Sequence, residues 1–332
     1  MTDIQDVNNF DGLVSSDDIR TGFISGATFK NKPVQYSVVD GLAIFEGCIV
    51  LGTVEEMEAK AAAVRSGEDV EEANGRGVFI VGEGRRWPNG IVPYDIDGNL
   101  TKQERISKAI AHWESNTSIR FVRRTSGNAS QYPNYVYFRR ADGCFSSVGM
   151  TGKGRQDIGL GERCSTGSTI HEIGHALGLW HEQSREDRDR HIRINWENIK
   201  DNHRHNFNQH ITDGDDHGDY DYDSIMHYPK HAFAIDRNKP TIMPIDSTKK
   251  IGQRDSLSKG DIATIQFLYQ GAAPNARPYT IQAGDTLFIV AERELGDGNR
   301  WREIMKTQNG STFSEQEASN LRPGQVVYLP VS

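Results

Sequence analysis

The strongest constraint on this chain is the run HEIGHALGLWH at residues 171–181. On an α-helix, residues four apart share a face, so His171 and His175 can direct their imidazoles to one point. Gly178 allows a left-handed residue after the helix, and the turn that follows can return His181 to the same point. The pattern predicts a helix over residues 168–179 and a metal site with three imidazole ligands.

The residues around this site predict a hydrolytic zinc centre. Three neutral imidazoles suit zinc and leave a fourth coordination position open for water, whose pKa zinc lowers towards ~7. Glu172 lies about 100° around the helix from His171, and we expect it to act as general base on that water. H-E-x-x-H arises by chance in roughly 2 of 100 chains of this composition, and the added glycine and third histidine reduce this to about 10⁻⁴.

Composition excludes several other classes of protein. The chain has 332 residues, with 36% hydrophobic and 25% charged residues, which favours folded domains over disorder. No apolar run approaches the ~18 residues of a membrane helix. The net charge of −8 disfavours nucleic-acid binding. The acidic N-terminus shows no secretory leader, so a leader was removed or export uses another route.

Several motifs together resemble the astacin family of metzincin zinc proteases. They are HExxHxxGxxH, the continuation HEQSREDRDRHI from His181, DYDSIMHY at residues 221–228, and WPNGIVPY at residues 87–94. The resemblance covers residues 78–270 and implies an α+β, two-subdomain catalytic fold. It also implies a twisted, mostly parallel sheet with an antiparallel edge strand above the active-site cleft. The activity implied is zinc-dependent endopeptidase activity on protein and peptide substrates, with one catalytic zinc ion.

The resemblance also implies roles for residues outside the zinc motif. Tyr228 would bind the resting metal and stabilise the oxyanion, while Met226 would pack beneath the metal. Cys144 and Cys164 would form a disulfide. Cys144, Phe145 and Ser146 would belong to the edge strand that pairs with substrate. Arg254 would select an acidic side chain directly after the cut bond. Glu182 would bind the new N-terminus formed on activation.

Residues 1–77 resemble the pro-segment of a zymogen. Residues 45–48 read Phe-Glu-Gly-Cys, similar to the astacin switch F-x-G-D with cysteine in place of aspartate. The Cys48 thiolate would then occupy the zinc until cleavage near Arg76 to Val78. The alternative is that Cys48 is a small buried residue in a strand. Within this segment, strong helix formers and Gly67 predict a helix over residues 54–65.

Other elements are expected along the catalytic region. Thr101 and Glu104 have the spacing of a capping box, which predicts a helix starting at Thr101. Strands are expected within residues 118–124 and 134–140, and a late helix over residues 258–269. Four histidines in a polar stretch are expected at the surface rather than in a second metal site: His203, His205, His210 and His217.

A linker at residues 271–277 precedes a separate module at residues 278–332 that resembles a LysM domain. Y-T-x-x-x-G-D-T-L near its start and LRPGQVVYLP near its end carry this resemblance. It implies a βααβ fold that binds N-acetylglucosamine polymers in peptidoglycan or chitin. A cap at Thr286 and four core positions are expected: Ile281, Leu287, Ile304 and Leu329.

Two rival functions remain open at this stage. One is a cell-wall-binding protein whose metal is structural, although Glu172 argues against it because a structural site needs no base. The other is a zinc hydrolase of cell-wall crosslinks. In each case a secreted or cell-envelope location is expected.

Overall fold

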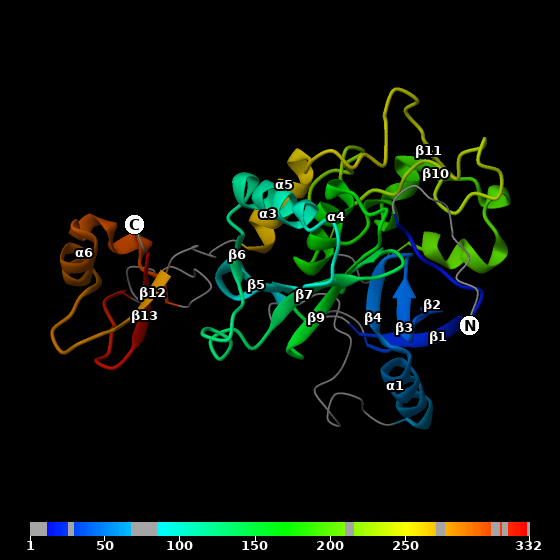
Figure 1. Cartoon of the computed structure of the whole chain (residues 1–332). Coiled ribbons are helices and arrows are strands. Elements are labelled where there is room, and N and C mark those ends of the chain that lie inside the picture. The colour runs from blue at the N-terminus through cyan, green and yellow to red at the C-terminus, as the bar shows by residue number, and fades with distance from the viewer. Residues whose placement is uncertain are drawn as a thin grey trace.

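The computed structural model describes residues 12–25, 30–67, 85–209, 216–269, 276–306, 313 and 318–330. The elements form an N-terminal segment (residues 12–67), a central domain (residues 85–269) and a C-terminal module (residues 276–330) (Figure 1). Within the described residues, no helix combines the length and apolar character needed to cross a membrane.

The N-terminal segment is a four-stranded antiparallel sheet followed by a helix. The strands, in the order β1-β2-β3-β4, are Ile19–Ile24, Lys32–Val39, Leu42–Phe45 and Ile49–Thr53. Helix α1, Val54–Ser66, starts at a Thr53–Glu56 capping box and ends at left-handed Gly67, which confirms the expected helix. The sheet was not predicted from the sequence. Part of its core comes from the central domain, at Val148 and Trp180, so local patterning could not reveal it.

The central domain is built on a five-stranded sheet in the order β6-β5-β7-β9-β8. All neighbours are parallel except the edge strand β8, which confirms the expected topology. In chain order the strands are β5 Ile91–Ile96, β6 Arg120–Arg123, β7 Tyr135–Arg140, β8 Cys144–Phe145 and β9 Arg155–Leu160.

Helices α3 (Glu104–Asn116), α4 (Thr166–Ala176) and α5 (Lys259–Leu268) lie on one side of this sheet (Figure 1). The Trp113 indole donates to the Ile170 carbonyl at 3.1 Å and so links α3 to α4. The Trp87 indole donates to the Ala176 carbonyl at 2.8 Å, near the end of α4. The zinc-motif helix is therefore held by buried hydrogen bonds from two tryptophans. The capping box of α5 at Ser258 confirms the late helix.

The predicted start of α3 at Thr101 is wrong. The helix begins at Glu104, and Lys102 has a left-handed φ of 53°, which interrupts the helical turn. The Thr101 hydroxyl donates to Glu162, 61 residues further along the chain, instead of capping α3. A long-range partner thus replaced the local one that the spacing suggested.

Short elements make up much of the rest of the central domain. The 3-10 helices are η2 Pro88–Gly90, η3 Glu182–Ser184, η4 Arg188–Arg190, η5 Trp196–Asn198 and η6 Asp201–Phe207. Strands β10 (Ile192–Ile194) and β11 (Ile242–Pro244) form an antiparallel pair. The Cys144–Cys164 disulfide joins β8 to the loop before α4, as the resemblance implied.

The C-terminal module pairs β12 (Ala276–Thr280) with β13 (Val326–Pro330) in antiparallel register. Between them lie α6 (Leu287–Leu295), capped by the Thr286 side chain, and the 3-10 helix η7 (Gly298–Glu303). The four predicted core residues are all buried in one cluster. Of the predicted linker, residues 271–275 lie outside the described residues. Its last two residues, Ala276 and Arg277, are not a linker, because they pair with β13 as the start of β12.

Candidate metal centre and active site

Four buried side chains direct ligand atoms to one point. The Cys48 Sγ atom lies 3.6, 3.3 and 3.2 Å from the Nε2 atoms of His171, His175 and His181. All four ligand atoms lie within 4.8 Å of one another. Among the described residues, no other group of three or more His, Cys, Asp or Glu side chains has this geometry.

The outer ring nitrogens show that this cluster fits a zinc ion. The Nδ1 atoms of His171 and His175 donate to the Ile225 and Leu179 carbonyls, both at 2.8 Å. His181 Nδ1 donates to the Glu46 carboxylate at 2.7 Å. Each Nε2 therefore turns its lone pair toward the shared centre. Burial also lowers the pKa of His171 and His175 well below the ordinary value, which favours the neutral ligand form.

Local structure explains how the three histidines meet. A capping box between Ser165 and Ser168 starts α4, and the helix ends at Ala176, earlier than predicted. Gly178 then adopts φ +110°, a conformation that a side chain disfavours, and the chain turns to bring His181 back. The convergence predicted from the sequence is confirmed.

The turn at residues 224–228 packs against α4. A Cβ at Gly174 would come within 2.7 Å of the Met226 Sδ atom, so the methionine packs directly against the zinc-motif helix. Asp261 of α5 accepts hydrogen bonds from the Ser224 hydroxyl at 2.7 Å and the Ile225 amide at 2.9 Å. Since Ile225 accepts from His171, Asp261 orients a ligand indirectly. Asp261 was not predicted as a functional residue from the sequence, where its one signal is its place three residues after Ser258 in the α5 capping box.

Glu172 and Tyr228 flank the metal centre. Glu172 is 1% exposed and follows the first ligand on α4. The Tyr228 ring centroid lies 4.7 Å from that of His181, and its hydroxyl donates to the Glu46 carbonyl at 2.6 Å. Burial, followed by Glu46 and Cys48, raises the Tyr228 pKa well above the ordinary value, so the phenol keeps its proton.

The N-terminal segment covers the edge strand beside the metal. The Ser146 amide donates to the Cys48 carbonyl at 2.9 Å, and the Val50 amide donates to the Ser146 carbonyl at 2.8 Å, in a parallel bridge. The Cys144 amide donates to the Gly12 carbonyl at 2.8 Å. Gly47 adopts φ +68°, and a Cβ there would lie 2.8 Å from Phe233, which explains the glycine before Cys48.

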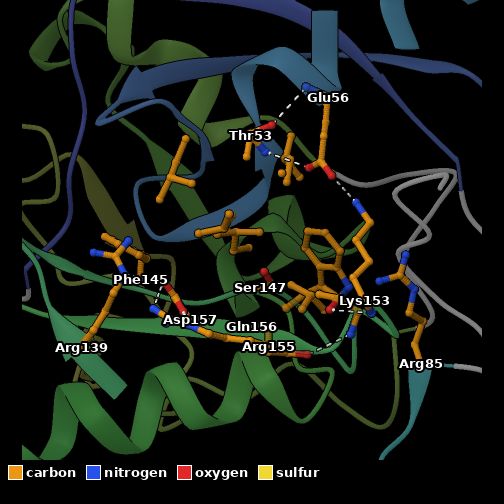
Figure 2. A pocket seen from close by; sticks show the side chains of 18 residues that line it. Thr53, Glu56, Arg85, Arg139, Phe145, Ser147, Lys153, Arg155, Gln156 and Asp157 are labelled. Carbon is orange, nitrogen blue, oxygen red and sulfur yellow. Dashed lines mark hydrogen bonds and ion pairs between the residues drawn. The ribbon is translucent and has the colours of Figure 1, made fainter. Parts of the chain in front are cut away.

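A cavity of about 380 Å³ remains where the N-terminal segment meets β9 and the loop after β8. Glu56 and Lys153 both line it, and Figure 2 shows their side chains pointing toward each other, with the Lys153 ammonium 2.7 Å from the carboxylate. On its other wall, Asp157 forms ion pairs with Arg139 and Arg155. The N-terminal segment therefore supplies both a wall and a charge of this cavity.

A second cavity, of about 230 Å³, lies beside Glu182 and Arg86. The Glu182 side chain is 14% exposed and accepts from the Asp221 amide at 2.7 Å. Burial raises its pKa to about 8. The predicted cleavage region, Arg76 to Val78, lies outside the described residues.

Arg254 is half-buried, and its guanidinium donates to the carbonyls of His227 at 3.0 Å and Gln253 at 2.9 Å. Its own carbonyl lies so close to α4 that a Cβ at Gly167 would approach it to 1.8 Å. The residue is thus fixed between the zinc-motif helix and the turn that contains Tyr228.

The prediction of surface histidines is wrong for His203 and His205. Both are buried in η6, and His203 Nδ1 lies 3.1 Å from the Ser15 hydroxyl of the N-terminal segment. His217 stacks on Phe267, with ring centroids 4.2 Å apart, and His210 lies outside the described residues. The polar sequence around these histidines gave no sign that η6 contacts the N-terminal segment, which lies far away in the chain.

Comparison with known sequences decides the family. The model of the Astacin peptidase family matches residues 79–270, more than half of the chain. The chain belongs to the astacin family. It is a zinc metalloendopeptidase, and the cluster of three histidines and Cys48 is its zinc site.

Known astacins agree with this assignment. The chain is 40% identical over 197 residues to human Tolloid-like protein 1, covering 56% of this chain and 19% of the relative. It is 36% identical over 236 residues to Blastula protease 10 of Paracentrotus lividus, covering 68% and 38% respectively. These alignments therefore span well under half of each relative's length.

Among solved structures, the chain resembles High choriolytic enzyme 1, a hatching enzyme zinc-protease from the medaka Oryzias latipes. The TM-score is 0.51 at 38% identity, over 56% of this chain and 92% of that chain. The similarity supports the α+β astacin fold of the central domain.

Proposed function

We propose that the chain is an astacin zymogen in which residues 1–77 are the pro-segment that keeps the peptidase domain, residues 78–270, inactive. The observation that carries this proposal is the Cys48 thiol, 3.2–3.6 Å from the Nε2 atoms of all three histidines. A thiolate is a good zinc ligand and would fill the position that water needs. Cys48 thus takes the role that aspartate has in the usual family switch.

After the pro-segment leaves, the remaining side chains can perform hydrolysis. A zinc ion held by His171, His175 and His181 would lower the pKa of a water molecule and polarise the peptide carbonyl. Glu172 accepts the proton of the attacking water and returns it to the leaving amine. The Tyr228 hydroxyl, released from the Glu46 carbonyl, donates a hydrogen bond to the developing oxyanion.

The edge strand is the proposed substrate-binding element. Cys144 and Ser146 use their amides to bind the N-terminal segment, and Phe145 lies between them in β8. An extended substrate would take over these main-chain hydrogen bonds. Removal of the pro-segment is therefore a condition for substrate entry as well as for zinc exposure.

We also propose that Arg254 selects an acidic side chain directly after the cut. Its fixed position next to α4 supports this, and a guanidinium–carboxylate contact would give roughly 10- to 150-fold discrimination. Profiling the activated enzyme and Arg254→Ala with a peptide library tests the assignment. Loss of an acidic preference in the variant supports it, while an unchanged preference excludes it.

Activation would require cleavage near Arg76 to Val78. The new ammonium group would then enter the cavity beside Glu182, where a mostly buried carboxylate already lies 3.6 Å from the Arg185 guanidinium and would gain a second cationic partner. N-terminal sequencing of the active enzyme tests this assignment. A mature start well beyond Trp87 would exclude it, because that chain could not reach Glu182 as proposed.

The linker, residues 271–277, would join a LysM module, residues 278–332, that binds peptidoglycan or chitin-type glycan. The paired strands β12 and β13 and the Thr286-capped helix α6 support this interpretation. We further infer a secreted or cell-envelope location, since a disulfide such as Cys144–Cys164 persists in oxidising compartments.

The decisive experiment is a casein-hydrolysis assay on the full chain before and after limited proteolysis, with and without a chelator. We expect hydrolysis only after processing, its loss with chelator, and its recovery with added zinc. Activity of the intact chain equal to that of the processed chain would exclude the zymogen proposal. Peptidoglycan digestion without casein hydrolysis would instead favour a hydrolase of cell-wall crosslinks.

A further inference from the structure

The switch turn contains a second buried group that zinc blocking alone does not explain. Glu46, next to Gly47 and Cys48, is 0% exposed. A buried carboxylate is costly unless hydrogen bonds compensate for lost water. Glu46 accepts from His181 Nδ1 and from the Ser184 hydroxyl, both at 2.7 Å. This carboxylate therefore connects the N-terminal segment to a zinc ligand and to η3.

The backbone conformation places Glu46 and Cys48 on two sides of the same imidazole. Glu46 and Gly47 both adopt left-handed φ values, 45° and 68°. As a result, Glu46 Oε2 lies 2.7 Å from Nδ1 of His181, while Cys48 Sγ lies 3.2 Å from Nε2. The main-chain carbonyl of Glu46 also accepts from the Tyr228 hydroxyl. One turn thus contacts both nitrogens of a ligand and the proposed oxyanion donor.

The other two ligands differ from His181 in the origin of their Nδ1 acceptors. His171 and His175 donate to carbonyls of Ile225 and Leu179, which remain in the mature enzyme. The His181 acceptor is a carboxylate that departs with the pro-segment. A carboxylate on Nδ1 makes an imidazole a stronger metal ligand and fixes its orientation. The latent and mature zinc sites therefore differ at His181 as well as at the fourth ligand position.

We propose that Glu46 is a positioning residue for latency, which holds His181 and Ser184 and thereby keeps the Cys48 thiolate on the zinc. This inference rests on the proposed role of Cys48 and extends it. When the pro-segment leaves, His181 Nδ1, the Ser184 hydroxyl and the Tyr228 hydroxyl are released together.

Alkylation of Cys48 can measure this effect, since Cys48 is the one cysteine outside the disulfide. The zinc-loaded full chain is made as Glu46→Gln and Glu46→Ala, both in a Glu172→Gln background that prevents self-cleavage. Glu58→Gln is the matched control, because it removes the same charge from an exposed pair with Arg20. We expect iodoacetamide to label both Glu46 variants about 10-fold or more faster than the parent. Glu58→Gln should stay within about 2-fold.

A double-mutant cycle tests whether Ser184 shares this effect. Ser184→Ala should accelerate labelling, and the Glu46→Gln/Ser184→Ala pair should label no faster than Glu46→Gln alone. Independent, additive acceleration by the two changes would overturn the proposed clamp. The Glu46 variants made with Glu172 intact provide a folding control, because removal of residues 1–77 yields the same mature chain as wild type. Equal kcat/KM after activation shows that the catalytic domain folded.

Cobalt substitution separates failure of this inference from failure of the Cys48 switch. The cobalt-loaded parent should show a thiolate-to-cobalt absorption band, and the Glu46 variants should show a weaker one. No band in the parent would refute the switch itself. A full band in all chains, with parental labelling rates, would refute the role of Glu46 and leave the switch intact.

Discussion

The N-terminal segment and the C-terminal module flank the catalytic domain, but they build their cores differently. The sheet of the N-terminal segment packs with Val148 and Trp180 of the central domain. A second buried cluster of this segment includes Phe145 from β8 of the central domain. The core of the C-terminal module is a single cluster drawn from residues 279–329. One region shares its hydrophobic core with the catalytic domain, while the other has a core of its own.

Polar contacts show the same difference. The N-terminal segment reaches the catalytic domain through Ser15–His203, Asp17–Asn202 and Glu56–Lys153 as well as through the zinc site. In the C-terminal module, Tyr279, Asp285 and Arg293 bind one another. We therefore expect changes in the first region to alter the active site and removal of the second to leave it intact.

The largest expected effect comes from removing the general base of the catalytic domain, which both flanking regions adjoin. Glu172→Gln should retain zinc and both flanking regions, but lower peptide hydrolysis by about 10² or more, because an amide cannot accept the proton of water. The measurement is casein hydrolysis by the activated variant, together with its metal content. Near-normal turnover by a zinc-loaded variant would contradict the mechanism.

The next largest effect is expected from removing the contact between the N-terminal segment and the zinc site. Cys48→Ala should weaken latency, because zinc loses its blocking ligand while the rest of the segment still covers β8. We expect peptide hydrolysis by the intact variant to exceed that of the intact wild type, while thermal unfolding of the C-terminal module stays unchanged. If the variant is as latent as wild type, Cys48 is a packing residue.

A smaller effect should appear as pH dependence at the same interface. Burial is the main cause that lowers the pKa of His203 to about 4, with Lys200 lowering it further and Asp17 opposing. Release of the N-terminal segment would expose His203 and return its pKa toward 6.5. The released state then binds more protons between about pH 4 and 6.5, so docking weakens as pH falls through this window. Burial lowers the pKa of His205 in the same direction.

Amide hydrogen exchange can follow this pH dependence at residues 12–25, corrected for intrinsic exchange rates. We expect wild type to lose several-fold more protection between pH 7 and pH 5 than His203→Gln loses. The variant removes the titrating group, so acid effects on the zinc ligands are common to both chains. Equal losses would assign the pH dependence to other groups.

The smallest expected effect on hydrolysis comes from deleting residues 278–332. Because the C-terminal module has its own core, kcat/KM on a peptide should stay within about 2-fold of the full-length activated enzyme. The full-length chain should co-sediment with insoluble peptidoglycan or chitin, and the truncated chain should stay in the supernatant. A collapse of catalysis would show that the module is part of the catalytic fold and that the two flanking regions do not differ in this way.

Local spacing predicted a large part of this protein. His171 and His175 indicated the zinc site, since helical geometry brings residues four apart onto one face. Gly178 indicated the turn after α4 that returns His181 to the same point. Strong helix formers and Gly67 likewise predicted α1, a late helix was expected where α5 lies, and Thr286 was expected to cap α6. The core positions of the C-terminal module were also predicted. The starts and ends of these helices depend on contacts between residues close in the chain.

Only the tertiary structure decided the features that join distant segments. The carboxylate of Glu46 meets His181 across 135 residues, and His203 meets Ser15 across 188. Thr101 lost its capping role to a partner 61 residues away, and Asp261 holds the turn that supports His171. Polar residues such as these have no periodicity that marks burial. Their roles follow from which surfaces come together when the N-terminal sheet and η6 close around the zinc site.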